Sequence, residues 1–335
     1  MDATAALHEE SLFQPAGDSH QASAEREYAN YSYVRETIIR FFQNKSAAIS
    51  LFLIILIVIM SFVGPKMVPY DAFTVDSAHT NYPPRIPGIE QLGICDGTRN
   101  GVDLYEQGGI ANEYHYFGTD NLGRDLWVRV WEGTQISLAV AFVAVIVDVI
   151  IGVIYGLSSG YYGGRVDILM QRVTEVLSSI PQLVIVTLMI VVLSPGLTNI
   201  VIALFITGWI EMSRVVRAQV LKLKNQEFTL AARTLGVSSR NIIFKEILPN
   251  TTSQIVVTMM FSIPNAICLE AFLAVVGLGV PAPTASLGTL INDGYKAATI
   301  YPHLVLAPVI VLAILMLGFN LFGDGLRDAL DPERA

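Results

Sequence analysis

The sequence predicts an all-α integral membrane protein with six transmembrane helices, and three observations support this fold class. Of the 335 residues, 53% are hydrophobic and only 15% are charged, whereas about 25% of the residues of a soluble domain are charged. The mean hydropathy is +0.52, and six separate runs are apolar enough for a span, which takes about 20 residues. Lys and Arg residues gather between alternate runs, as they do on the cytoplasmic side of a membrane.

The six predicted spans are ordered along the whole chain. They cover residues 46–64, 136–155, 173–193, 197–210, 255–280 and 304–322. The fourth is the shortest, and we expect it to continue into the helix that follows it. Pro181, Pro264 and Pro308 lie within apolar runs and are expected to kink their helices.

The basic residues predict the orientation. If the N-terminus is cytoplasmic, fifteen of the 21 Lys and Arg residues fall on the cytoplasmic side, and five of the other six lie in one long outer loop. An even number of spans then places both termini in the cytoplasm. The positive-inside rule therefore favours a multi-pass membrane protein with both ends inside.

The segments outside the spans predict the domain organisation. The expected units are a flexible cytoplasmic tail at 1–30, an N-terminal helix with the first span at 31–64, an external loop or cap at 65–132, and a core transmembrane domain at 133–335 that contains a polar loop at 212–250. In residues 28–43, Ile38, Phe41 and Phe42 lie on one helical face, which is typical of an amphipathic helix at the membrane surface. A helical extension of the first span explains them equally well.

The polar loop reads as two short helices. Phe228, Ala231, Ala232 and Leu235 have the spacing i, i+3, i+4 and i+7, which predicts a helix with one apolar face. Gly236 is expected to end this helix in a left-handed conformation.

A second helix is expected to begin at Ser238 or Ser239. It presents four apolar residues on one side, and Pro249 is expected to stop it before the fifth span. These residues are Ile243, Phe244, Ile247 and Leu248. Physical reasoning alone leaves an ordinary amphipathic hairpin between two spans as an equal alternative.

Four segments carry a resemblance to a known family. The stretch from Glu227 to Gly236, followed by Ile247-Leu-Pro-Asn250, resembles the signature cytoplasmic loop of bacterial ATP-binding-cassette (ABC) importer permeases. Three more segments, in order, resemble the second permease subunit of oligopeptide and dipeptide importers. They are 117–125 (FGTDNLGRD), 159–167 (SGYYGGRVD) with Arg172 and Ile180-Pro181, and 277–288 with 320–328 (NLFGDGLRD) and Asp331-Pro332. Residues 86–97 look like the longer outer loop of Gram-positive oligopeptide permeases.

The resemblance implies a type I importer permease of the bacterial cell membrane that works in a complex. Two homologous permeases form the pathway, two ABC ATPase subunits bind ATP-Mg, and an external binding protein delivers the peptide. The polar loop would couple the permease to a groove of one ATPase, through Glu227, Ala231, Ala232, Arg233, Gly236, Ile243, Phe244, Leu248 and Pro249.

Some positions depart from the family pattern. Leu230 replaces a usual Glu and Glu246 a usual His, which affects particular ATPase contacts; Gln135 replaces a usual Arg and Leu287 a usual Trp.

Several acidic residues are candidates for the pathway or for docking. Asp148 lies in the middle of the second span, where an ionisable residue is a functional candidate by default; a neutral packing acid is the alternative. Glu175 and Glu270 occupy acidic positions of the family and are pathway candidates. Asp120, Arg124 and Asp125 are candidates for docking the binding protein, although an ion-paired elbow into the second span is the favoured interpretation.

The sequence contains no motif for enzyme chemistry of its own. It has no Gly-x-x-x-x-Gly-Lys-Ser/Thr loop, so it is not expected to hold nucleotide phosphates in that way, and no cofactor or metal is expected in this chain. Cys95 and Cys268 are not expected to pair, and a pI of about 5.1 argues against nucleic-acid binding.

Two alternative functions stay open. Permeases of dipeptide and nickel importers share much of the sequence pattern that resembles oligopeptide permeases. An ion-coupled secondary transporter, with Asp148 and Glu270 as proton sites, is the alternative from another class, but its hallmark is an internal repeat.

Overall fold

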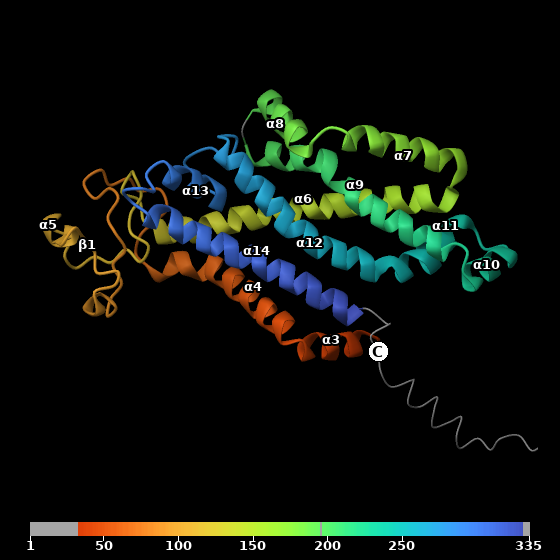
Figure 1. The fold of residues 1–335 in the computed structure, drawn as a ribbon, viewed down its shortest axis with the longest axis horizontal. Coiled ribbons are helices and arrows are strands. Elements are labelled where there is room, and N and C mark those ends of the chain that lie inside the picture. Colours follow the sequence, from red (N-terminus) through yellow and green to blue (C-terminus); the bar gives the residue numbers. More distant parts are fainter. Residues whose placement is uncertain (1–32, 195, 331–335) are drawn as a thin grey trace, which may run out of the picture.

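The computed structural model describes residues 33–194 and 196–330. The predicted tail at 1–30 and the Asp331-Pro332 pair lie outside these residues. The described part is an elongated helical bundle with a small cap at one end (Figure 1).

The helices are α3 (Tyr33–Gln43), α4 (Lys45–Val63), α5 (Leu104–Gln107), α6 (Leu126–Tyr162), α7 (Gly164–Ser178), α8 (Gln182–Leu193), α9 (Leu197–Leu223), α10 (Glu227–Thr234), α11 (Ser239–Asn241), α12 (Leu248–Val275), α13 (Leu287–Tyr295) and α14 (His303–Leu330). Two 3₁₀ turns, η1 (Gly64–Met67) and η2 (Glu90–Leu92), and a π-helical turn, η3 (Ile242–Ile247), join them. Strands β1 (Thr98–Arg99) and β2 (Val102–Asp103) form a small antiparallel hairpin.

Within the described residues, five helical segments are long and apolar enough to cross a membrane. They are Lys45–Met67, Leu126–Tyr162, Leu197–Leu223, Ser239–Val275 and His303–Leu330. The bent pair α7 and α8 makes a sixth when it is counted as one span. The expected continuation of the fourth span is confirmed, since α9 runs on to Leu223.

The third predicted span needs a correction, because it is not one helix. α7 and α8 are bent by 77° at a short break, where Pro181 precedes the first residue of α8. Proline lacks an N–H and disfavours helical backbone in the residue before it. A continuous apolar run therefore folds as two helices.

The fifth span also differs from its prediction at both ends. Pro249 does not stop the preceding helix, because α11, η3 and α12 form one continuous helix from Ser239 to Val275. Pro249 lies in the first turn of α12, and just before it the Leu248 N–H bonds to the Ile243 carbonyl, five residues back. The π-helical register accommodates the missing proline donor. The helix ends at Val275 rather than residue 280, since Gly277 adopts a φ of 86°.

The seam between α6 and α9 depends on glycine. A Cβ on Gly152 would lie 2.6 Å from Met212 Cβ, and one on Gly156 would lie 2.6 Å from the Ser213 carbonyl oxygen. Small residues at four-residue spacing let two helix backbones approach closely inside a membrane. The glycines of α6 therefore set how closely α9 packs.

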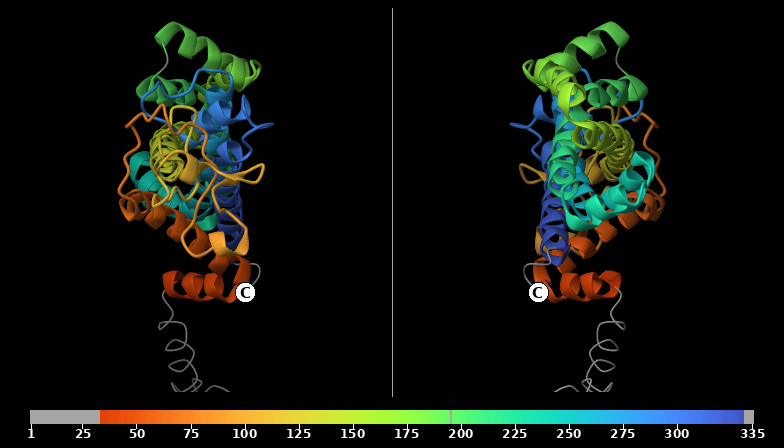
Figure 2. Two further views of the ribbon diagram at one scale, coloured as in Figure 1. Left: turned by 90° about the vertical axis from the view of Figure 1, so that its left-hand side faces the viewer. Right: turned by 90° about the vertical axis from the view of Figure 1, so that its right-hand side faces the viewer.

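The N-terminal helix is separate from the first span. Asn44 caps α4 and accepts a hydrogen bond from the Ser46 N–H at 3.1 Å, so α3 is not an extension of α4. Phe41 is buried and packs against Phe322 of α14, with ring centroids 5.3 Å apart, whereas Ile38 and Phe42 are exposed. Figure 2 shows α3 at one side of the bundle and the α7–α8 pair at the other.

The cap, residues 68–125, is folded rather than an open loop. Tyr105 is fully buried, and its hydroxyl donates to the Pro83 carbonyl at 2.8 Å. The β1–β2 hairpin turns at Asn100 and Gly101, which both have positive φ, as a two-residue hairpin favours. The predicted Gly- and Pro-rich outer segment thus forms a compact unit around an aromatic core.

Candidate functional site

The predicted turn after α10 has the expected geometry. Gly236 adopts a φ of 78°, its N–H bonds to the Arg233 carbonyl, and the Val237 N–H bonds to the Ala232 carbonyl, both at 3.1 Å. This pair of bonds is a Schellman motif, in which the left-handed residue is usually glycine. Ser238 is the N-cap residue of the next helix, but its side chain makes no capping hydrogen bond.

Most of the apolar face predicted for α10 is exposed on the surface of the chain rather than packed against its core. Ala232 packs against the cluster around Val216 and Ile243, and Thr229 is fully buried and donates to the Leu223 carbonyl at 2.9 Å. In contrast, Phe228 and Leu235 are 39% and 83% exposed. The helix is therefore anchored through Thr229, a residue that the periodicity did not single out because a lone hydroxyl carries no pattern.

Five exposed apolar side chains at this end of the molecule form what we call the loop surface: Phe228, Leu230, Leu235, Val237 and Phe244. Five of the predicted contact residues, Glu227, Ala231, Arg233, Gly236 and Pro249, are exposed as well. Ile243 is buried and Leu248 partly buried in the chain's own core. Ile243 is therefore not available to a partner in this conformation, and both residues hold the continuous helix against α9.

Polar contacts tie the loop to the corner between α6 and α7. Arg217 of α9 donates two hydrogen bonds of 2.7 Å to the Asp167 carboxylate of α7. Lys224, just before α10, donates to the Gly160 carbonyl at 2.9 Å, and Arg233 lies 5.8 Å from the centre of the Tyr161 ring. The sequence motif at 159–167 contained Asp167, but only the fold pairs it with Arg217.

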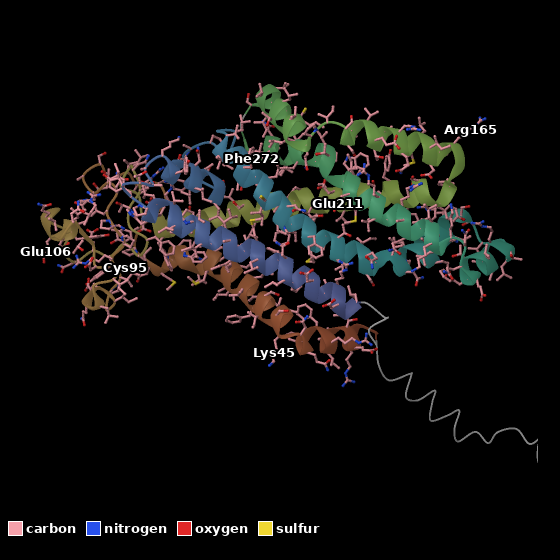
Figure 3. All side chains as sticks on the ribbon, in the orientation of Figure 1. Lys45, Cys95, Glu106, Arg165, Glu211 and Phe272 are labelled. Carbon is pink, nitrogen blue, oxygen red and sulfur yellow. The ribbon has the colours of Figure 1, made fainter. Side chains whose placement is uncertain are left out.

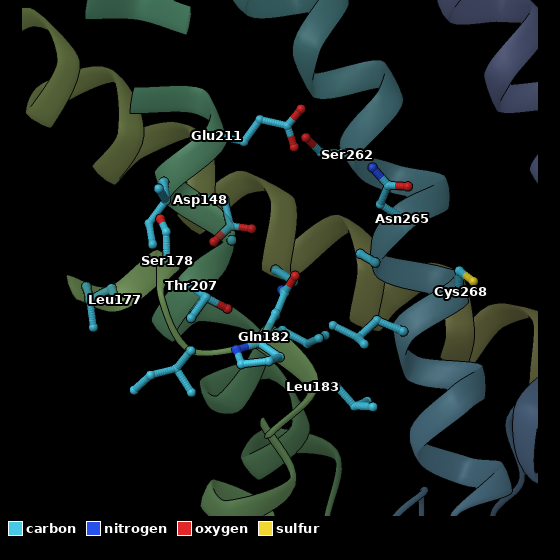
Figure 4. Close-up of a pocket in the computed structure, with 18 of the residues that line it drawn as sticks. Asp148, Leu177, Ser178, Gln182, Leu183, Thr207, Glu211, Ser262, Asn265 and Cys268 are labelled. Carbon is cyan, nitrogen blue, oxygen red and sulfur yellow. The ribbon is translucent and has the colours of Figure 1, made fainter. Parts of the chain in front are cut away.

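A cavity of about 640 Å³ lies within the bundle. Glu211, one of its lining residues, is placed between the cap end, where Glu106 lies, and the opposite end, where Arg165 lies (Figure 3). Its walls come from α6, α9, α12 and the break between α7 and α8. The polar lining residues include Asp148, Thr207, Glu211, Ser262 and Asn265 (Figure 4).

Of the three pathway candidates, only Asp148 lines this cavity. Its carboxylate packs against Gly208 of α9, where a Cβ would lie 1.9 Å from Oδ2. The Oδ1 atom is buried and has no hydrogen-bond partner. A glycine at 208 is thus required to make room for this acid between two helices.

The other two pathway candidates lie elsewhere. Glu270 is fully buried and accepts a hydrogen bond from the Ser137 hydroxyl at 3.0 Å. Ser137 Oγ also accepts one from the Leu287 N–H at the start of α13, at 3.2 Å. Glu175 is on the surface of α7 and pairs with Arg172 at 2.6 Å. Neither carboxylate lines the cavity, because Glu270 faces the α6–α13 contact and Glu175 faces away from the core.

The three docking candidates are buried in the structure, so their side chains are not available to a partner. Asp120 accepts hydrogen bonds from Arg124 at 2.8 Å and from Arg129. Asp125 caps α6 by accepting from the Val128 N–H at 2.8 Å. These contacts form the ion-paired elbow into the second span, as the favoured interpretation of the sequence expected.

The cap also contains a pair formed by a histidine and an aspartate. His79 Nδ1 lies 2.5 Å from Asp76 Oδ2, and this hydrogen bond raises the pKa of His79 and lowers the pKa of Asp76. Within residues 33–194 and 196–330, no group of three or more His, Cys, Asp or Glu residues is arranged to hold a metal ion. Cys95 and Cys268 are both unpaired.

Comparisons with known proteins agree over most of the chain. Residues 149–335 match the family described as binding-protein-dependent transport system inner membrane component. Residues 32–84 match the N-terminal TM domain of oligopeptide transport permease C.

Individual relatives extend the match to nearly full length. The oligopeptide transport system permease protein OppC of Bacillus subtilis is 41% identical, over 96% of this chain and 97% of that protein. The dipeptide transport system permease protein DppC of Lactococcus lactis is 40% identical, over 90% of this chain and 91% of that protein. Among solved structures, an inward-facing MetNI methionine ABC transporter chain has a TM-score of 0.50 and 20% identity, over 61% of this chain and 96% of that chain. It supports the fold alone.

Proposed function

The chain belongs to the family of binding-protein-dependent transport system inner membrane components, and from this we propose that it is the permease subunit of an ATP-driven ABC importer for oligopeptides. The identity of 41% with an oligopeptide permease, over 96% of this chain, carries the proposal. It is a multi-pass integral membrane transport protein, and its relatives are transport permeases rather than enzymes.

The proposed complex contains this chain, a second homologous permease, two ABC ATPase subunits and an extracellular peptide-binding protein. ATP-Mg belongs to the ATPases, so this chain takes no cofactor of its own. The loop surface then lies in the cytoplasm and the cap outside, with both termini cytoplasmic. Fifteen of the 21 basic residues support this orientation.

The mechanism we propose is alternating access. Closure of the ATPases on ATP presses on the loop surface, and α10 moves as a rigid piece because the Gly236 turn and the buried Thr229 fix both of its ends. The continuous helix from Ser239 to Val275 and the Arg217–Asp167 bond carry the movement to α12 and α7. Both helices border the cavity, which therefore opens to one side of the membrane at a time.

Co-purification tests the assembly. From detergent-solubilised native membranes, the chain should recover a second permease, two ATPases and a peptide-binding protein. Leu235→Arg should lose the ATPases, because a charge replaces an apolar side chain that is 83% exposed on the loop surface. Leu92→Arg is the matched control in the cap, where Leu92 is 75% exposed, and it should retain them. Retention of the ATPases by Leu235→Arg would contradict the coupling role.

A dipeptide importer is the second candidate, because the DppC of Lactococcus lactis is 40% identical. Uptake into proteoliposomes that hold the whole complex separates the two. For an oligopeptide importer, unlabelled pentapeptide should compete with labelled pentapeptide far better than dipeptide does. Competition by dipeptide alone would shift the assignment.

A further inference from the structure

Two residues that line the cavity each contain a buried polar atom without a hydrogen-bond partner, namely Asp148 Oδ1 and Thr207 Oγ1. Thr207 is only 9% exposed, and Figure 4 shows both side chains at the cavity, on neighbouring helices. A buried polar group without a partner is costly. Both positions therefore suit a ligand that supplies hydrogen bonds.

The lining decides which chemistry fits. Two carboxylates, Asp148 and Glu211, face this cavity together with hydroxyls and side-chain amides. Among the described residues, Asp148 forms no ion pair, and Arg214, the basic lining residue, donates to the Ser178 hydroxyl at 2.7 Å. The site is rich in acceptors, and a primary ammonium group offers three donors and no acceptor.

The size of the cavity argues for an organic ligand. Its volume of about 640 Å³ falls within the range of roughly 300–1,000 Å³ that is usual for small-molecule sites. The described residues offer no cluster of three metal ligands. Gly208 keeps the Asp148 carboxylate at the surface of α9, because any side chain there would displace it.

We propose that this cavity contains a subsite for the primary ammonium group of the transported peptide, with Asp148 as its charge partner and Thr207 as a hydrogen-bond acceptor. The inference rests on the proposed function and names a recognition element inside the permease. The peptide N-terminus and a lysine side chain both carry this group. Both are therefore included in the test.

Cys268 provides a direct assay, because it is exposed and lines the same cavity. In the purified complex, Cys95→Ser leaves Cys268 as the only cysteine of this chain. The rate of Cys268 labelling by a maleimide is measured with trialanine, N-acetyl-trialanine or N-acetyl-Ala-Lys-Ala, without ATP or binding protein. Trialanine or the lysine peptide should slow labelling, N-acetyl-trialanine should not, and the more effective of the first two identifies the source of the ammonium group.

Variants link the protection to the subsite. Asp148→Asn should raise the half-protecting concentration at least about tenfold, as expected when a charged partner is lost. Thr207→Val should raise it less. Glu175→Gln, an acid outside the cavity, should leave it unchanged. If Asp148→Asn does not assemble with its partners, Thr207→Val alone decides the result.

Equal protection by N-acetyl-trialanine, unchanged protection in both cavity variants, or no protection by any peptide would overturn the subsite. The assay does not depend on transport. Failure of the wild-type complex to take up peptide would therefore count against the proposed function, while protection by a free amine would still support the subsite.

Discussion

Asp120 accepts hydrogen bonds from Arg124 and Arg129, and the three side chains are at most 8% exposed. Arg172 and Glu175 form an equally direct pair, but their side chains are 72% and 55% exposed. Water screens the exposed second pair much more than the buried first pair. The buried ion pairs of Asp120 therefore hold the elbow into α6 together, whereas the exposed Arg172–Glu175 pair contributes little to stability.

Asp120→Asn should destabilise the protein by about 3–5 kcal/mol, because it leaves buried guanidinium groups without their charge partner. Glu175→Gln is the exposed comparison and should cost less than about 1 kcal/mol. Thermal unfolding of the purified complex, followed by a probe in the cap, measures both. Equal shifts in the two variants would contradict the buried role of Asp120.

Gly236 contributes through its backbone alone. A Cβ there would meet no atom within 4 Å, but the φ of 78° is unfavourable for other residues. We expect Gly236→Val to abolish ATP-driven uptake, since the strain of about 1–3 kcal/mol opens the turn that fixes α10. ATP binding by the ATPases should persist. Gly236→Asn is the control and should keep most of the uptake, because Asn tolerates this conformation.

At the scale of elements, the close contact between α6 and α9 depends on glycines, which have no side chain to hold the two helices apart. Three glycines of α6, at 152, 156 and 160, lie against α9, so the backbones themselves form the seam. The two helices also supply Asp148 and Thr207 to the cavity. Their spacing therefore determines the shape of the proposed subsite.

Gly156→Val should prevent close packing, because its Cβ alone would lie 2.6 Å from the Ser213 carbonyl oxygen and 2.7 Å from Val216 Cβ. We expect poor assembly and a lower unfolding temperature, since backbone atoms cannot yield as side chains do. Gly196→Ala is the matched control, as its nearest neighbour would be 3.7 Å away. Gel filtration and thermal unfolding report the difference.

At the scale of the whole molecule, the loop surface and the cavity are separate sites on shared helices. α9 borders the cavity through Thr207 and Glu211 and carries Arg217 near the loop. α12 runs from the loop to the cavity without interruption. A push on one site can therefore reach the other through helices rather than through flexible links.

Arg217→Gln should leave the complex assembled but lower the number of peptides taken up per ATP hydrolysed, because α7 loses its double hydrogen bond to α9. Arg172→Gln, on the exposed face of α7, should keep the ratio. Parallel measurement of uptake and phosphate release in proteoliposomes gives the comparison. If Arg217→Gln leaves the ratio of peptide uptake to ATP hydrolysis unchanged, the Arg217–Asp167 contact does not carry the movement between the loop and the cavity.

The elements that were predicted well depend on local chemistry. Apolar runs located the five continuous spans, because a bilayer requires length and low charge whatever the neighbours are. They did not show that the third run folds as the bent α7–α8 pair. Gly236 was identified as a helix end from its residue type, and the structure shows it at a positive φ. Pro249 was interpreted wrongly, because a proline in the first turn of a helix is tolerated and only the register of its neighbours decides the outcome.

The sequence by itself determined the fold class, the family resemblance and the position of the loop, since each rests on composition or on residues close together in the chain. Only the tertiary structure decided which charged residues are buried and which pair with one another. Asp167 and Arg217 are 50 residues apart, and Ser137 and Glu270 are 133 apart. The role of a polar residue in a membrane protein depends on what the packed helices place opposite it, and no local pattern encodes that neighbour.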